Sequence, residues 1–224
     1  PPPCDCRSLF RAFLITALTV SAACVSARAD ALDDIRARGV LIWGGDQEGG
    51  GPFIYPDPDD PERVTGFEVE LAEVIARRLG VRAQFFQGAW DTLPQFLDNR
   101  QIDIVLNGYE WTPDRAGYMQ ASQPYYIYEL QLLAREGDTR FSTIEDLGRP
   151  PKGRRYRVGA LEGSAAATYL REHFPDTVEI RSYDGNTNAM TAVGSGIDDA
   201  TLQDLPIAIF YRDLEPGRGL KFVG

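Results

Sequence analysis

The sequence predicts an α/β protein with mostly parallel sheets flanked by helices, arranged in two lobes. Short β-branched runs alternate with amphipathic helical segments between Val40 and Leu106, which is typical of parallel strands joined by helical crossovers. A second series of the same kind begins at Tyr156. With 224 residues, 43% of them hydrophobic and 25% charged, the chain is long enough to build two modest cores.

The first 29 residues predict a Sec-type signal peptide and therefore a periplasmic location. Two arginines precede an apolar run from Phe13 to Val25, and Ala27-Arg28-Ala29 has the small-residue pattern of a signal peptidase site. The run is short for a membrane anchor. A lipid anchor at Cys24 is the weaker alternative, because Ser21 stands where lipoproteins carry a large aliphatic residue.

Composition excludes several classes of function. All three cysteines lie in the leader, so the exported chain has no disulfide or thiol chemistry. Without the leader's three arginines and one aspartate, 20 basic residues face 32 acidic ones, a formal balance of −12 that repels nucleic acid. We find no metal-ligand cluster and no nucleophile–base set, and the only histidine, His173, is expected on a solvated helix face. We therefore expect no metal, no cofactor and no catalytic residue.

The first lobe is expected over residues 30–126. Helices are predicted at 31–39, 66–80 and 90–99, and strands at 40–43, 81–86 and 102–106, the last covered on both faces. The helix at 66–80 is expected to pack on the core through Phe67, Leu71, Val74 and Ile75. The Pro- and Asp-rich tract from Tyr55 to Pro61 is predicted to be a solvated turn.

The second lobe is expected over residues 127–224, together with the hinge strands. The long β-rich run from Tyr125 to Arg135 predicts a strand that crosses between the lobes. Ser142 and Glu145 predict a capping box for a short helix that ends near Gly148. Further strands are predicted at 156–161, 178–183, 199–203 and 220–223, and helices at 163–174, 187–193 and 205–214.

The stretch from Ile102 to Tyr126 carries the main functional signal. A predicted strand ends at Asn107-Gly108, and Thr112 with Pro113 is typical of the N-cap and first position of a helix. Arg115 falls in the first turn of that helix. A strand end, a helix N-terminus and a guanidinium at one sheet edge favour binding of a carboxylate. The alternative is a capped helix with a solvated arginine.

The second lobe repeats this geometry. Ser164 and Ala165 open a helix after a strand, and Asp204 follows the strand that ends at Gln203. Facing edges of this kind predict a site for a zwitterion, with its carboxylate on Arg115 and the helix N–H groups and its ammonium on Asp204. The alternative for Asp204 is a helix cap.

Several blocks in order carry a resemblance to a known family. They are Pro52-Phe53, GFEVELAEVIARRLG, WxxLPxxL from Trp90, the DIVxxGxxxTPxR block that ends at Arg115, QPYY, VGALEGSAAATYL and DATLQDLP. With them the chain resembles the periplasmic amino-acid-binding proteins of ABC importers, bacterial extracellular solute-binding protein family 3. The resemblance implies a two-lobed type II periplasmic-binding-protein fold that closes over one free amino acid without catalysis. It also implies a monomer that delivers the ligand to an inner-membrane permease.

The resemblance assigns roles to individual residues. Arg115 corresponds to the family's carboxylate-binding arginine, and Ser164 and Ala165 to carboxylate contacts from the second lobe. Asp204 corresponds to the ammonium-binding acid, and Gly108 to the position whose carbonyl contacts the ammonium.

Other positions bear on the ligand side chain. Trp90 corresponds to a ring that packs on it, with plain core packing as the alternative, and Asp46 to a position that faces it. The family has a hydroxyl residue where Glu110 stands, and an acid there repels a carboxylate unless it turns away or faces a cationic side chain. Gly50 replaces a common aromatic residue and leaves one wall open. Asp46, Glu48 and Glu110 together favour a polar or basic amino acid.

Three alternatives remain at this point. The family's C-terminal return to the first lobe does not follow Val223 in this sequence, which suits a fragment or the receptor part of a receptor–permease fusion. A ligand-sensing domain of a membrane receptor or kinase has the same features. A dehydratase-like enzyme on the same fold would need a base in the cleft, and Glu110 is the candidate.

Overall fold

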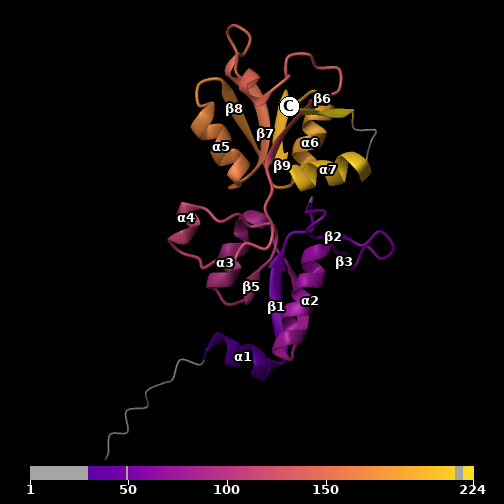
Figure 1. Cartoon of the computed structure of the whole chain (residues 1–224), viewed down its shortest axis with the longest axis vertical. Coiled ribbons are helices and arrows are strands. Elements are labelled where there is room, and N and C mark those ends of the chain that lie inside the picture. The colour runs from indigo at the N-terminus through magenta and orange to yellow at the C-terminus, as the bar shows by residue number, and fades with distance from the viewer. Residues whose placement is uncertain (1–29, 49, 215–218) are drawn as a thin grey trace, which may run out of the picture.

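The computed structural model describes residues 30–48, 50–214 and 219–224, and the expected signal peptide lies outside these ranges. Two lobes, each with its own sheet and flanking helices, lie one above the other along the long axis (Figure 1). Among the described residues, no helix is both long and apolar enough to cross a membrane.

The first lobe contains a three-stranded parallel sheet in the order β4-β1-β5, as the alternating pattern predicted. Its elements are α1 (Ala31–Arg38), β1 (Val40–Gly45), β2 (Tyr55–Pro56), β3 (Val64–Thr65), α2 (Phe67–Leu79), β4 (Arg82–Gln87), η1 (Trp90–Thr92), α3 (Leu93–Asp98), β5 (Ile104–Val105) and α4 (Pro113–Ala116). Because the three strands are parallel, their carboxyl ends share one edge of the sheet. The loops that follow β1, β4 and β5 therefore gather on the same side.

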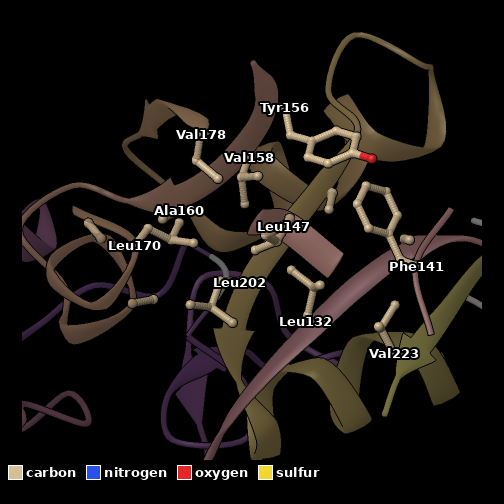
Figure 2. Packing of buried hydrophobic residues seen from close by; sticks show 14 residues of the cluster. Leu132, Phe141, Leu147, Tyr156, Val158, Ala160, Leu170, Val178, Leu202 and Val223 are labelled. Carbon is tan, nitrogen blue, oxygen red and sulfur yellow. The ribbon is translucent and has the colours of Figure 1, made fainter. Parts of the chain in front are cut away.

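The second lobe contains a mixed five-stranded sheet in the order β10-β6-β9-β7-β8. Its elements are β6 (Leu130–Arg135), η2 (Ile144–Gly148), β7 (Tyr156–Leu161), α5 (Ala165–His173), β8 (Val178–Tyr183), α6 (Asn186–Gly194), β9 (Ala200–Asp204), α7 (Leu205–Leu214) and β10 (Leu220–Val223). Strand β7 is parallel to β8 and β9, whereas β6 is antiparallel to β9 and β10. Figure 2 shows its core, where Val158, Leu170 and Leu202 are completely buried.

The connection between the lobes differs from the prediction. The predicted strand from Tyr125 begins only at Leu130, and the preceding residues run between the lobes without a sheet partner (Figure 1). Ile127, in the middle of this connection, is 87% exposed. The β-branched and aromatic composition predicted a strand here, but strand formation also needs a partner in a sheet, and these residues belong to neither sheet.

The packing face of α2 is also different from the prediction. Val74 is 44% exposed, whereas Glu68, Ala72 and Ala76 are buried on the face that meets the sheet. Two alanines four residues apart allow the helix to approach the sheet closely, and the larger side chains pack to either side. Three of the four residues predicted to pack on the core do pack against hydrophobic clusters, namely Phe67, Leu71 and Ile75, and only Val74 does not.

Three smaller predictions are corrected by local pairing. The capping box of η2 is made by Thr143 and Asp146, because the Asp146 carboxylate accepts both the Ser142 and Thr143 N–H groups. The tract that begins at Tyr55 contains strand β2, which pairs with β3. Strand β5 pairs only on the β1 side and is half-buried, not covered on both faces.

Candidate functional site

A narrow cavity lies between the two lobes. Its walls come from the strand-end loops of the first lobe and from β9 and the start of α5 in the second. Six of the eight predicted site residues line it, namely Asp46, Trp90, Gly108, Glu110, Ser164 and Asp204. The other two, Arg115 and Ala165, reach it through Glu110, which both of them contact.

Arg115 lies in α4, where Thr112 caps the helix and Pro113 occupies its first position, as predicted. The residue is only 7% exposed, so the alternative of a solvated arginine is wrong. Its guanidinium carbon lies 4.9 Å from the Trp90 ring centre and 4.6 Å from that of Tyr109, and the two rings stack 4.3 Å apart. The aromatic rings exclude water from the guanidinium and attract its charge.

Glu110 completes a carboxylate site that spans the two lobes. Its Oε2 lies 2.7 Å from Arg115 Nη1, and its Oε1 accepts the Ala165 N–H at 3.1 Å. Arg115 also donates to the Glu110 carbonyl at 2.6 Å and to the Gly163 carbonyl of the second lobe at 3.0 Å. A guanidinium and a helix N-terminus therefore hold one carboxylate, and that carboxylate belongs to the chain itself. The expected binding of a ligand carboxylate by these groups stays a prediction.

Asp204 is one of the acidic residues that line the cavity. It is the last residue of β9, whereas the sequence placed it just after the end of this strand. Burial, and then the nearby charge of Glu110, raises the pKa of Asp204 to about 8. A buried carboxyl with a raised pKa gains most from an incoming cation, because the cation stabilises its ionised form.

Asp46 lines the cavity but is already fully engaged within the first lobe. Its carboxylate accepts hydrogen bonds from the Glu48 N–H at 2.9 Å, Gln87 Nε2 at 2.9 Å and the Trp90 N–H at 3.1 Å. Burial is the main cause that raises the pKa of Asp46. These contacts fasten the loops after β1 and β4 together and fix the position of Trp90.

Trp90 and Ser164 are held in place by contacts with their own lobes. The Trp90 indole N–H donates to the Asn107 carbonyl at 3.0 Å, so the ring is fixed against the strand-end loop. The Ser164 hydroxyl donates to the Leu161 carbonyl at 2.8 Å and accepts the Ala167 N–H at 3.2 Å, which confirms Ser164 as the N-cap of α5. Rigid neighbours of this kind keep a binding site pre-organised.

Gly108 takes a backbone conformation that favours glycine, with a φ of 61°. Its N–H donates to Glu68 Oε1 at 2.9 Å, and its carbonyl lies 3.5 Å from the Tyr128 hydroxyl. Sequence reasoning did not single out Glu68, although it supports the Gly108 turn, is completely buried and also accepts a hydrogen bond from Tyr125. The sequence feature that could have indicated its burial is its position on the same helical face as Ala72 and Ala76.

Gln203 is a second residue that sequence reasoning missed. It lines the cavity beside Asp204, is 1% exposed and donates to the Thr201 hydroxyl at 2.7 Å. Its Oε1 has no hydrogen-bond partner among the described residues. A polar residue next to Asp204 at the carboxyl end of a strand was the available signal.

Substitution of Glu68 tests how the Gly108 turn is held. Burial raises the pKa of Glu68, so its contribution to folding is present at low pH and is lost as pH rises above about 4.5. We expect Glu68→Ala to destabilise the fold by about 1–3 kcal/mol, because a buried N–H and a hydroxyl lose their acceptor. Glu68→Gln keeps the acceptor and removes the charge, so its stability relative to wild type should increase between pH 5 and pH 8. Urea unfolding of both proteins at pH 5 and pH 8 measures the difference between their free energies of unfolding. If this difference is the same at both pH values, the prediction is wrong.

Comparison with known proteins agrees with this architecture. The family model for bacterial extracellular solute-binding proteins, family 3, matches residues 43–205. The L-cystine-binding protein TcyJ of Escherichia coli K12 is 33% identical over 174 residues, which cover 77% of this chain and 62% of TcyJ. The chain thus spans less than two thirds of the length of that relative.

Solved structures give the same result. An ancestral amino-acid-binding protein, AncCDT-1, described as a precursor of cyclohexadienyl dehydratase, superposes with a TM-score of 0.78 at 30% identity, over 87% of this chain and 81% of that one. An ancestral arginine-binding protein bound to arginine gives a TM-score of 0.76 at 28% identity, over 84% and 79% of the two chains. The family match covers most of the chain and agrees with its two-lobed fold, so this protein belongs to the bacterial extracellular solute-binding proteins, family 3.

Proposed function

We propose that this chain is the ligand-binding part of a periplasmic receptor that binds one free amino acid and delivers it to an inner-membrane ABC permease. The ligand would lie in the interlobe cavity, with its carboxylate toward Arg115 and the start of α5 and its ammonium toward Asp204. A polar or basic side chain would fit the acidic cavity. Export by the Sec-type signal peptide and action as a monomer belong to the same proposal.

One observation carries this proposal. Two features at the same cavity support it: groups from both lobes that hold the carboxylate of Glu110, and Asp204, an acid of raised pKa. Each charge-assisted hydrogen bond contributes about 1.5–3 kcal/mol when water is excluded, and micromolar affinity needs about 8 kcal/mol. A few contacts at each end of a zwitterion are therefore enough.

The dehydratase alternative receives less support from the site. A general base has to be available to take a proton from the substrate. The Glu110 carboxylate is instead ion-paired with Arg115 and hydrogen-bonded to the Ala165 N–H. These contacts already occupy both carboxylate oxygens, which leaves neither of them free to take a proton from a substrate.

A panel of free amino acids tests the proposed function. The full-length protein should show a higher melting temperature with one amino acid or a small group of them, because binding to the folded state stabilises it. Titration calorimetry of each hit then gives the affinity and the stoichiometry. A panel without any shift, on protein shown to be folded, would refute amino-acid binding.

A further inference from the structure

The cavity's carboxylate-binding groups are held by a carboxylate of the chain itself. The Glu110 carboxylate is ion-paired with Arg115 Nη1 and accepts a hydrogen bond from the Ala165 N–H. Both side chains of the ion pair are nearly buried, since 9% of the Arg115 side chain and 12% of the Glu110 side chain are exposed. The contact joins a loop of the first lobe to the N-terminus of α5 in the second. A ligand carboxylate can bind the Arg115 guanidinium and the Ala165 N–H only if it displaces the Glu110 carboxylate from them.

The charges around the cavity are unbalanced. Four acids line it, namely Asp46, Glu48, Glu110 and Asp204, and no lysine or arginine is among the lining residues that the structure describes. The guanidinium in contact with the site, that of Arg115, is already paired with Glu110. A zwitterion adds no net charge to this group of acids, whereas an amino acid with a cationic side chain adds one positive charge.

We propose that Glu110 is a specificity-determining residue that acts as a tethered competitor for the ligand carboxylate, so that the receptor selects amino acids with a cationic side chain. This inference rests on the proposed function. Before ligand binds, Glu110 fills the anion position and links the lobes through Arg115 and Ala165. A ligand carboxylate displaces it, and the released Glu110 carboxylate then needs a new partner inside an acidic cavity.

The ligand's own side chain supplies that partner. Glu110 lines the same cavity as Asp204, and its charge contributes to the raised pKa of Asp204, so it borders the space that the ligand would fill. A cationic side chain pairs with the displaced carboxylate, whereas a neutral side chain leaves it unpaired beside Asp204. The loss of one ion pair is thus offset for a basic ligand and remains a net cost for a neutral one.

Matched ligands on matched variants test the proposal. Arginine and citrulline have nearly the same shape but differ in side-chain charge, and agmatine is arginine without its carboxylate. Titration calorimetry on the full-length wild type should give an affinity for arginine at least about tenfold above that for citrulline. Glu110→Gln removes the competitor while keeping its size, so its affinity for citrulline should rise about tenfold and the preference for arginine should shrink. Glu162→Gln removes an exposed charge beside Gly163 and should keep the wild-type preference.

The possible failures can be told apart. If wild type binds amino acids and Glu110→Gln leaves both affinities unchanged, Glu110 does not compete and the inference is wrong. Wild-type binding of agmatine as tight as that of arginine would also overturn it, because no carboxylate would then displace Glu110. If neither protein binds any free amino acid, the proposed function itself fails. Lysine and norleucine form a second matched pair for the same comparison.

Discussion

Replacing Arg115 with Ala is expected to abolish ligand-induced stabilisation while the protein stays folded. The variant loses two or more charge-assisted hydrogen bonds to the ligand carboxylate, so we expect the affinity to fall by at least about 100-fold. The fold should tolerate the change, because Arg115 lies at the interface of the lobes and the Glu110 carboxylate can reach water when they separate. Calorimetric titration and a thermal shift with the best ligand of the panel measure both effects.

The control for this prediction is an arginine far from the cavity. Arg149 has a side chain that is 78% exposed and pairs with Asp146 across one turn. Arg149→Ala removes the same charge and should bind ligand with wild-type affinity. If Arg115→Ala binds as tightly as this control, Arg115 is not part of the site and the ligand carboxylate binds elsewhere.

Ligand affinity is expected to rise with pH up to about 8 and then to level off, because of Asp204. Burial and the charge of Glu110 raise its pKa to about 8, so the carboxyl is largely protonated at pH 6. An ammonium binds the ionised form, and binding therefore releases a proton below pH 8. The dissociation constant should fall by up to about tenfold per pH unit in this range. Titration calorimetry between pH 5.5 and 8.5, in buffers of different ionisation enthalpy, measures affinity and proton release together.

The stability of the protein without ligand should change in the opposite sense. A folded-state pKa raised from 3.8 to about 8 gives a contribution to folding that is complete below pH 3.8 and is lost as pH rises through about 8. Asp204→Asn removes the titrating carboxyl, and with it the contribution of Asp204 to the pH dependence of stability and of ligand affinity. The variant should bind the ligand weakly at every pH in this range. Glu110 and the Tyr128 hydroxyl also face this carboxyl, and Glu110→Gln should lower its pKa and move the pH profile of affinity downward. A wild-type affinity that is constant from pH 5.5 to 8.5 would contradict the role of Asp204.

Local patterns predicted most of the elements of the fold. Ser164 and Thr112 cap the helices that carry the site, as predicted, and α1 and α2 end close to the predicted positions, at glycines in the left-handed conformation. Such signals depend on backbone hydrogen bonding within a few residues, so they can be read from the sequence. Where a prediction failed, as at Val74, the outcome depended on which helical face a distant sheet could accommodate.

The sequence also predicted that Arg115, the start of α5 and Asp204 belong to one site. It did so because the carboxyl ends of parallel strands share an edge, so residues that follow different strands come together. The burial of Glu68 and Gln203 near these residues was not predicted. A polar residue is expected at the surface from its type alone, and only the tertiary structure shows that it is buried. The expected engagement of Asp46 with a ligand side chain stays a prediction, and its three hydrogen bonds within the first lobe limit what it can still offer.

The sequence by itself determined the α/β class, the order of the elements and the residue types able to hold a carboxylate and an ammonium, because these follow from periodicity, capping and charge. Only the tertiary structure decided which partner each charged group has. Glu110 shows the difference, since the sequence presented it as an acid out of place, and the structure pairs it with Arg115 and the Ala165 N–H across the cavity. The physical reason is that such contacts depend on distances of a few ångströms, which the folded loop sets for Arg115 and the approach of the two lobes sets for the Ala165 N–H.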